Sequence, residues 1–292
     1  MNIDSRNQLL KSKILSNKSF GKRLGRLLKE CPTVVITGAS SGIGQSFSEL
    51  FMTVAENILI CNLSRSKSSI FSDGVNFADI ECDVSDLPSI DSAVGKVMEL
   101  RAERNLKGGI LVVNNAGFGG YGMFPEPSLE HNCGMIDVNV RGLTYVCGKF
   151  IPIIKQTGGG FINVASTASW QPCPFLGVYA ATKAYVMSFS LSLDWELRKF
   201  GSKCLCLCPG PTTTNFFRRA GFETRPLKRD FGHEAVEVAA SAISAYSKGK
   251  NLKVVGLLNN VLTFVNYFMP RFLMCKISGP ILERVRGNPR RK

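Results

Sequence analysis

From residue 33 onward, short apolar runs alternate with longer segments whose apolar residues recur at helical spacing. Parallel strands need long crossover connections, usually helices, so this alternation predicts a parallel sheet with helices on both faces. We predict one doubly wound α/β domain, of Rossmann type, with a seven-stranded parallel sheet. The predicted strands are 33–37, 57–62, 77–82, 110–114, 160–165, 203–208 and 252–255, and the predicted helices are 43–55, 86–104, 128–154, 178–200 and 233–247.

A glycine-rich motif, T-G-A-S-S-G-I-G, occupies residues 37–44 and joins the first predicted strand to the first predicted helix. Glycines at 38, 42 and 44 would let the backbone turn sharply and approach a pyrophosphate, while the amides that open the helix face the phosphates. A plain glycine-rich turn is the alternative, but the strand–turn–helix context favours a dinucleotide site.

The end of the second predicted strand indicates which dinucleotide is bound. An NAD-binding chain usually has an acidic residue there, but the sequence from Cys61 to Lys67 contains no carboxylate. Ser64 and Arg65 could instead bind a 2′-phosphate through charge-assisted hydrogen bonds. We predict NADP(H) as the cofactor, with NAD(H) as the alternative.

A tyrosine and a lysine, Tyr179 and Lys183, are spaced to share one face of a helix. A phenol with a pKa near ~10 is a poor acid or base at neutral pH unless its anion is stabilised, which an ammonium one turn away would do. The same spacing also occurs on solvated helix faces. The spacing becomes informative because other motifs accompany it in the sequence. Ser166 follows the fifth predicted strand, Asn139 lies in a predicted helix, and N-N-A-G occupies 114–117 at the end of the fourth strand.

In the order and spacing of these motifs, the chain resembles the short-chain dehydrogenase/reductase family over about residues 31–255. The resemblance implies an oxidoreductase that interconverts a ketone or aldehyde and an alcohol. It implies that Tyr179 transfers the proton and that Ser166 hydrogen-bonds the substrate oxygen. Lys183 would lower the tyrosine pKa and bind the nicotinamide ribose, and Asn139 would hold a water linked to Lys183.

The cofactor site predicted from the glycine motif and the resemblance extends along several strand ends. Its members are Thr37, Gly38, Ser40, Ser41, Gly42, Ile43, Gly44, Ser64, Arg65, Asp83, Val84, Asn115, Ala116, Gly117, Tyr179, Lys183, Pro209, Gly210, Thr212 and Thr214.

An apolar, proline-containing stretch between Ser166 and Tyr179 indicates a lipophilic ketone or alcohol as substrate, such as a retinoid, steroid or fatty-acyl derivative. The predicted substrate pocket consists of Ser166, Trp170, Phe175, Tyr179 and Phe216. A basic loop that runs to Arg229 is a candidate lid.

The charge of the chain is concentrated at its ends. Residues 1–30 carry a net charge of +6 and residues 248–292 carry +9, so the total of +14 leaves −1 for residues 31–247. This pattern argues against a nucleic-acid-binding fold and suggests contact with an anionic membrane, unless the ends only confer solubility. Residues 1–30 also include Phe20, Leu24, Leu27 and Leu28 in a possible basic amphipathic helix.

The segment 257–285 extends beyond the minimal fold, and similar extensions occur in lipid- and steroid-type members of the family. Its apolar residues, Leu258, Val261, Leu262, Val265, Phe268 and Met269, repeat at helical spacing opposite Asn259, Asn260, Thr263 and Asn266, before Pro270. It could cap the substrate cleft, dimerise or lie on a membrane, and we expect the apolar face to cover the cleft. The predicted organisation is thus a basic extension at 1–30, a dinucleotide-binding catalytic domain at 31–256 and an amphipathic basic extension at 257–292.

The ten cysteines are expected to be reduced thiols, because they are scattered through apolar segments. A metal cluster at Cys204, Cys206 and Cys208 is conceivable, but we predict no metal site. We expect a cytoplasmic protein, either free or peripheral on a membrane, that acts on a small carbonyl or alcohol and forms a dimer or tetramer. The alternative function is a non-catalytic scaffold that keeps the fold and engages membranes through its basic ends.

Overall fold

A wholly parallel seven-stranded sheet forms the centre of the computed structural model, which describes residues 3–54, 57–68, 70–72, 74, 76–221 and 232–285. The strands lie in the order β3-β2-β1-β4-β5-β6-β9, so the direction of winding reverses between β1 and β4. Their bounds are β1 Thr33–Thr37, β2 Leu59–Ser64, β3 Phe77–Glu81, β4 Ile110–Asn114, β5 Gly159–Val164, β6 Lys203–Cys208 and β9 Leu252–Val254. The predicted fold class is confirmed.

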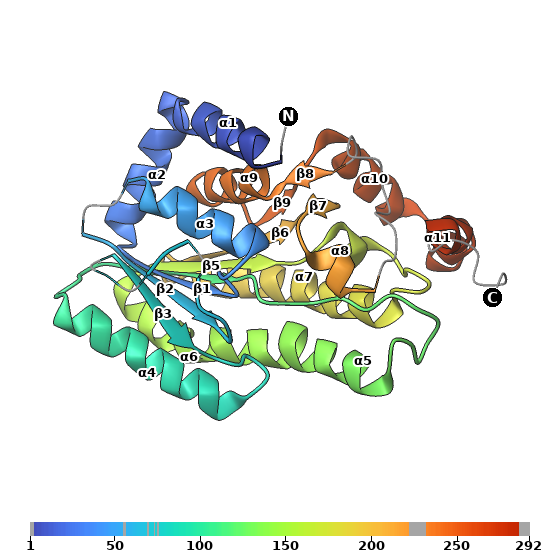
Figure 1. The fold of residues 1–292 in the computed structure, drawn as a ribbon, viewed down its shortest axis with the longest axis horizontal. Helices are drawn as coiled ribbons and strands as arrows, with labels where there is room; N and C mark the ends of the chain where they lie inside the picture. Colours follow the sequence, from blue (N-terminus) through green and yellow to red (C-terminus); the bar gives the residue numbers. More distant parts are fainter. Residues whose placement is uncertain are drawn as a thin grey trace.

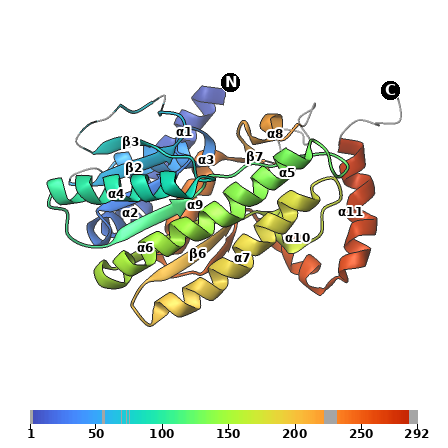
Figure 2. The same ribbon diagram turned by 90° about the horizontal axis from the view of Figure 1, so that it is seen from below.

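Helices cover both faces of this sheet (Figures 1 and 2). One face carries α1 Ile3–Leu15, α2 Lys18–Glu30, α3 Gly42–Met52 and α9 Ala235–Ser247, and the other carries α4 Leu87–Glu103, α5 Leu129–Ile136, α6 Leu143–Thr157 and α7 Gly177–Arg198. The central strands β1, β4 and β5 are buried along almost their whole length and are mainly apolar, as expected for strands that are covered on both faces. A small parallel pair, β7 Thr212–Thr213 and β8 His233–Glu234, lies beside the main sheet near the short α8 Phe216–Arg219.

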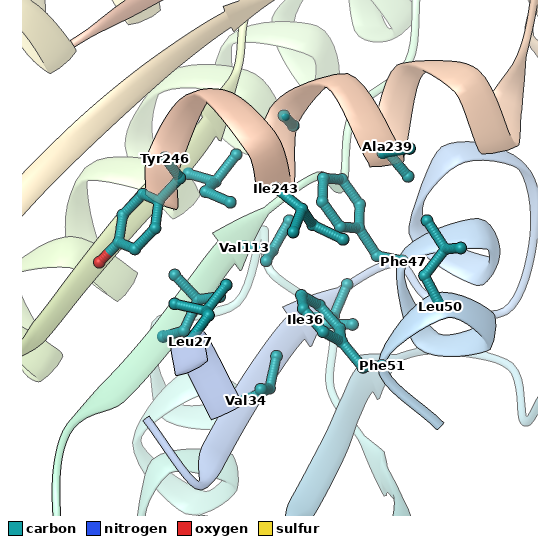
Figure 3. Packing of buried hydrophobic residues seen from close by; sticks show 14 of the residues in the cluster. Leu27, Val34, Ile36, Phe47, Leu50, Phe51, Val113, Ala239, Ile243 and Tyr246 are labelled. Carbon is teal, nitrogen blue, oxygen red and sulfur yellow. The ribbon is translucent and has the colours of Figure 1, made fainter. Parts of the chain in front are cut away.

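The predicted basic amphipathic helix near the N-terminus is α2, and its apolar face belongs to the main core. Phe20, Leu24, Leu27 and Leu28 are all buried there. Figure 3 shows Leu27 beside β1 and beneath α9. The basic side chains lie on the opposite face, as amphipathic packing requires. This apolar face is therefore used inside the fold.

Two predicted elements differ in their bounds. The second strand begins at Leu59 rather than at residue 57, because Asn57 has a left-handed φ of 57°, which an extended strand cannot contain. The single helix predicted over 128–154 consists of α5 and α6 joined by a π-helical turn, η1 Asp137–Gly142. A Cβ on Gly142 would lie 2.0 Å from the Val84 carbonyl oxygen, so this turn packs against the chain that follows β3.

The C-terminal segment forms α10 Leu257–Phe268 and α11 Arg271–Val285, which lie together at one end of the molecule (Figure 2). The expectation that the apolar face of this segment covers the substrate cleft is wrong. Thr263 is the one buried residue of α10, whereas the apolar residues from Leu257 to Phe268 are exposed. The asparagine face packs against the body because its amides reach backbone carbonyls: Asn259 donates to Val255 O at 2.7 Å.

The three cysteines of β6 point into the core on the α7 side of the sheet. All are free thiols, and burial raises the pKa of Cys204 well above its ordinary value. Within the described residues, no group of three His, Cys, Asp or Glu side chains is arranged to hold a metal ion.

Candidate active site

A cavity of about 260 Å³ lies at the carboxyl ends of β1, β4, β5 and β6. This is the edge of a doubly wound sheet at which ligands bind, next to the point where the strand order reverses. The predicted residues that line it are Ser41, Gly42, Ile43, Asn115, Gly117, Ser166, Tyr179, Lys183, Pro209, Gly210, Thr212, Thr214 and Phe216. The fold therefore brings together residues from five separate segments of the chain.

The glycine motif forms a tight turn whose shape excludes side chains. Gly38 and Gly42 have φ values of 70° and 60°, which favour glycine. A Cβ on Gly44 would lie 2.5 Å from both Asn115 Nδ2 and the Gly38 carbonyl oxygen. Asn115 Nδ2 donates to that same oxygen at 3.0 Å, which ties the turn to the end of β4. The opening amides of α3 are left for a ligand, since Ser41 makes no side-chain cap.

One hydroxyl side chain and one amide side chain fix the shape of this turn through hydrogen bonds to the backbone. Thr37 Oγ1 accepts from the backbone amides of Asn115 and Ala116, both at 3.0 Å. Asn62, a site residue that the sequence prediction missed, accepts from the Ala39 amide at 2.9 Å and donates to Asp79 at 2.7 Å. A polar residue inside the apolar strand β2 was the signal for it, because a buried amide needs partners.

The second part of the predicted cofactor site lies at the ends of β2 and β3. Arg65 is 77 % exposed, and its guanidinium lies 3.9 Å from Asp83. Burial opposes ionisation of Asp83, but hydrogen bonds from Ser85 and the charge of Arg65 outweigh it and lower the pKa of that carboxyl. Ser64 donates to the carbonyl of Ser66 at the same strand end. Arg65 is thus free enough to meet a ligand phosphate at little desolvation cost.

Tyr179, Lys183 and Ser166 meet inside the cavity. Tyr179 and Lys183 lie one turn apart on α7, and the lysine Nζ is 5.9 Å from the centre of the tyrosine ring. Lys183 Nζ donates to Val164 O at 2.8 Å, at the end of β5. Ser166 caps η2 Thr167–Trp170 by accepting from the Ala168 amide at 3.1 Å. The capping geometry fixes the hydroxyl of Ser166 beside the tyrosine.

Burial dominates the protonation of the tyrosine and the lysine. It raises the pKa of Tyr179 to about 12, although a hydrogen bond with Ser166 acts in the opposite direction. Burial lowers the pKa of Lys183 to about 8, against the opposing influence of Cys206 and Cys208. In the protein alone the tyrosine pKa is therefore raised, whereas the sequence argument predicted that the lysine lowers it. The reason is that the free-energy cost of removing a phenolate from water is larger than the stabilisation that the neighbouring Lys183 amine gives it.

Asn139 projects from the π-helical turn toward the lysine. Its Nδ2 donates to Phe118 O at 3.0 Å and to Thr182 Oγ1 at 3.1 Å. A Cβ on Gly117 would lie 2.8 Å from Asn139 Oδ1 and 3.4 Å from Lys183 Nζ, so both side chains border the same small space.

The predicted substrate residues separate into two groups. Phe216 lines the cavity with Ser166 and Tyr179, and its ring centre lies 5.3 Å from that of Tyr179. Trp170 instead packs against the core beneath the sheet, and Phe175 stacks on Tyr121 with ring centres 6.0 Å apart. Neither is part of the cavity wall in this structure.

Several lining residues were not predicted. The apolar ones lie in a loop, at the end of a strand, or at or near the start of a helix, where no periodic pattern marks them: Phe118, Val164, Leu176 and Phe217. Arg219 at the end of α8 also lines the cavity, and among the lining residues that the structure describes, Arg219 and Lys183 carry charged side chains. The candidate lid that runs to Arg229 falls mostly in 222–231, outside the described residues.

A sequence model of the short chain dehydrogenase family matches residues 32–223, about two-thirds of the chain and nearly all of the site described above. The chain belongs to the short-chain dehydrogenase/reductase family. The predicted resemblance is confirmed. Membership of this family also supports the prediction of an oxidoreductase that acts on alcohol and carbonyl groups.

Relatives of this short-chain dehydrogenase/reductase come from several bacteria. An uncharacterised oxidoreductase of Staphylococcus epidermidis is 27 % identical over 223 residues, which cover 75 % of this chain and 93 % of the relative. An NADPH-dependent 3-dehydrocapnine reductase of Ornithobacterium rhinotracheale is 28 % identical over 68 % of this chain and 72 % of its own length. Sulfoacetaldehyde reductase 2 of Chromohalobacter salexigens is 29 % identical over 63 % and 73 %.

Solved structures share the fold. A Burkholderia cenocepacia short-chain dehydrogenase in complex with NADP has a TM-score of 0.70 at 20 % identity and covers 85 % of this chain and 98 % of its own. A 3-ketoacyl-(acyl-carrier-protein) reductase of Brucella melitensis complexed with NADH has a TM-score of 0.67 at 24 % identity, with coverages of 76 % and 96 %.

Proposed function

We propose that the protein reduces a lipophilic ketone or aldehyde to an alcohol, with NADP(H) as its cofactor and Tyr179 as the proton donor. The observation that carries this proposal is the convergence of Ser166, Tyr179 and Lys183 on one cavity beside the glycine turn. A scaffold protein would have no need to keep all three groups in contact.

The protonation states suit reduction. The raised pKa of Tyr179 keeps the phenol protonated at neutral pH, which is the form that gives a proton to a developing alkoxide. The Ser166 hydroxyl would hold the carbonyl oxygen next to it. Lys183, with a pKa of about 8, is largely cationic at neutral pH and would stabilise the phenolate that remains. When bound, the nicotinamide would supply the hydride.

The cofactor preference rests on Arg65. Its exposed guanidinium at the end of β2 can form a charge-assisted pair with a 2′-phosphate, and a ligand phosphate would replace the distant contact with Asp83. A side chain at Gly44 would collide with Asn115 Nδ2 and the Gly38 carbonyl oxygen, and a turn without side chains is what a close approach of a pyrophosphate to the backbone requires. One curated relative is described as NADPH-dependent, and solved neighbours hold either NADP or NADH, which supports a nicotinamide dinucleotide.

The cavity wall supports a substrate of lipophilic character. Ile43, Phe118, Leu176, Phe216 and Phe217 give it an apolar surface. Both charged lining residues are cationic, so an anionic group on the substrate would be tolerated near Arg219. One relative carries the name of a reductase for sulfoacetaldehyde, an aldehyde with an anionic group, which is consistent with this choice.

A comparison of two tyrosines tests the proposal. Tyr179→Phe removes the donor with little change in shape, and we expect kcat for ketone reduction to fall by at least ~10²-fold while NADPH affinity is nearly unchanged. Tyr185→Phe, on the exposed side of the same helix, is the matched control and should retain full activity. A Tyr179→Phe enzyme of near-normal rate would refute the assignment. NADPH binding without turnover of any carbonyl in a broad panel would favour the scaffold alternative.

A further inference from the structure

The surface of α10 and α11 is unusually apolar for a region that contacts solvent. More than half of the large apolar side chains that are exposed in the described part of the chain lie on these two helices. Among them, Leu257, Phe264, Tyr267, Phe268 and Phe272 are between 67 and 84 % exposed. Exposed apolar patches of this kind mark sites of interaction. We propose that this surface, the α10–α11 face, lies on an anionic membrane.

The α10–α11 face is exposed because each helix contacts the body through a narrow stripe. In α10 that stripe contains Asn259, Thr263 and Asn266, and Asn266 donates to the Gln171 side chain. In α11, Met274 and Ser278 are buried, and the Ser278 hydroxyl reaches Pro172 O at 3.4 Å. Polar anchors therefore fix both helices, and the wide apolar side of each is left facing outward.

Charge identifies a membrane as the occupant. Residues 257–292, from the start of α10 onward, contain seven Lys or Arg and one acidic residue. Exposed Arg271, Lys276 and Arg284 lie on α11 itself, among the apolar side chains. If a second copy covered this face through a two-fold axis, the same cationic patch would meet itself and repel. An anionic bilayer attracts these charges and buries the apolar groups between them, and aromatic side chains are well suited to its interface.

Within the described residues, no helix combines the length and apolar character needed to cross a bilayer. Attachment would therefore be superficial, with the two helices lying in the plane of the interface rather than spanning it.

The position of the α10–α11 face relative to the cavity gives it a role, if the proposed lipophilic substrate is accepted. The segment from Ala168 to Leu176 lines the cavity at both of its ends. Between these ends the outer side of the segment is held by α10 and α11, through Gln171 and Pro172 and through contact of Pro174 with Gly279. The membrane surface would thus adjoin the substrate side of the cavity, so a lipophilic carbonyl could enter from the bilayer.

Vesicle co-sedimentation of the full chain tests the proposal. We expect binding to vesicles that contain phosphatidylglycerol, weaker binding to phosphatidylcholine alone, and release by salt. A Phe264→Glu/Phe268→Glu double variant should bind at least ~10-fold more weakly, because two apolar groups leave the interface and two like charges enter it. An Arg271→Glu/Lys276→Glu variant should lose the preference for the anionic lipid. Trp195→Glu is the matched control, since Trp195 is 79 % exposed on α7, away from this face, and it should bind like the wild type.

Thermal melts and NADPH binding check that each variant is folded. Binding by the phenylalanine variant equal to that of the wild type, or no binding by the wild type at low salt, would overturn the proposal. The proposal would also be overturned if the wild type is a dimer that does not bind vesicles and that the phenylalanine variant converts to monomers. The α10–α11 face would then be covered by a second copy of the chain. The vesicle assay needs no turnover, so a failure to find any reducible ketone would count against the proposed function and leave this result intact.

Discussion

Removing the buried amine of Lys183 should change how the stability of the protein depends on pH. The pKa of this amine falls from 10.5 to about 8 on folding because the side chain is buried. The ammonium is therefore about 3 kcal/mol less favourable in the folded chain than in the unfolded chain, at roughly 1.4 kcal/mol per pKa unit. Below pH 8 the amine is charged in both states, so the free energy of unfolding is lowered by this whole amount. Between pH 8 and 10.5 the folded state has lost a proton that the unfolded state keeps, so stability rises with pH, and above 10.5 the cost is gone.

Other groups titrate in the same range, so the measurement is a difference between two proteins. Lys183→Met keeps the length of the side chain and removes the charge. Its free energy of unfolding in urea, minus that of the wild type, should fall by roughly 2–3 kcal/mol between pH 7 and pH 10. Lys107→Met, at an exposed turn, should differ from the wild type by a constant amount. A Lys183→Met difference that does not change with pH would show that the ammonium is solvated in the cavity, and the burial argument would be refuted.

Three further substitutions test separate parts of the structure. Arg65→Ala should weaken NADP(H) binding by ~1.5–3 kcal/mol and leave NAD(H) almost unchanged in a titration of both cofactors, and equal weakening would exclude Arg65 as the 2′-phosphate ligand. Leu24→Ala should lower the free energy of unfolding by ~2–4 kcal/mol, because this side chain of α2 is fully buried; a loss below ~1 kcal/mol would mean that α2 is only loosely attached. Arg219→Ala should raise KM for ketones that carry an anionic group, without raising it for neutral ketones or weakening NADPH binding. If the substitution weakened NADPH binding and raised KM equally for anionic and neutral ketones, Arg219 would instead contact the cofactor.

The sheet could be predicted from the sequence because its strands are buried on both faces and therefore appear as mainly apolar runs, such as Thr33–Thr37 and Ile110–Asn114. That Ser166, Tyr179 and Lys183 lie near one another could be predicted because Ser166 follows the end of a strand and the other two are one helical turn apart. Loop residues carry no such periodic signal. Trp170 and Leu176 are both apolar and only six residues apart, yet the first packs into the core and the second lines the cavity.

The orientation of α10 could not be predicted from its pattern, although the pattern itself was correct. Periodicity shows that a helix has two unlike faces, and the usual inference places the apolar face inside. Here the polar face has specific partners within the fold, because the Asn260 amide donates to the carbonyl of Val254 at the end of β9 and the Asn259 amide donates to that of Val255. Because hydrogen bonds within the protein hold the polar face of α10 against the fold, its apolar face is turned outward.

The pKa values of Tyr179 and Lys183 show the same limit in energetic terms. The Tyr179–Lys183 spacing predicts contact on one helix face, but the direction of each pKa depends on how much water surrounds the pair, which spacing does not encode. Burial acts on the two groups in opposite directions: it keeps the phenol protonated and makes the amine easier to deprotonate. The pKa values of the phenol and the amine therefore move apart, to about 12 and about 8, while the amine donates to Val164 O. Any cation that enters this cavity beside Tyr179 would therefore lower the pKa of the phenol more strongly than the same cation would in water, because the surrounding dielectric is low. The protein alone thus holds the tyrosine as an acid, and the strength of that acid is set by the charge that binds next to it.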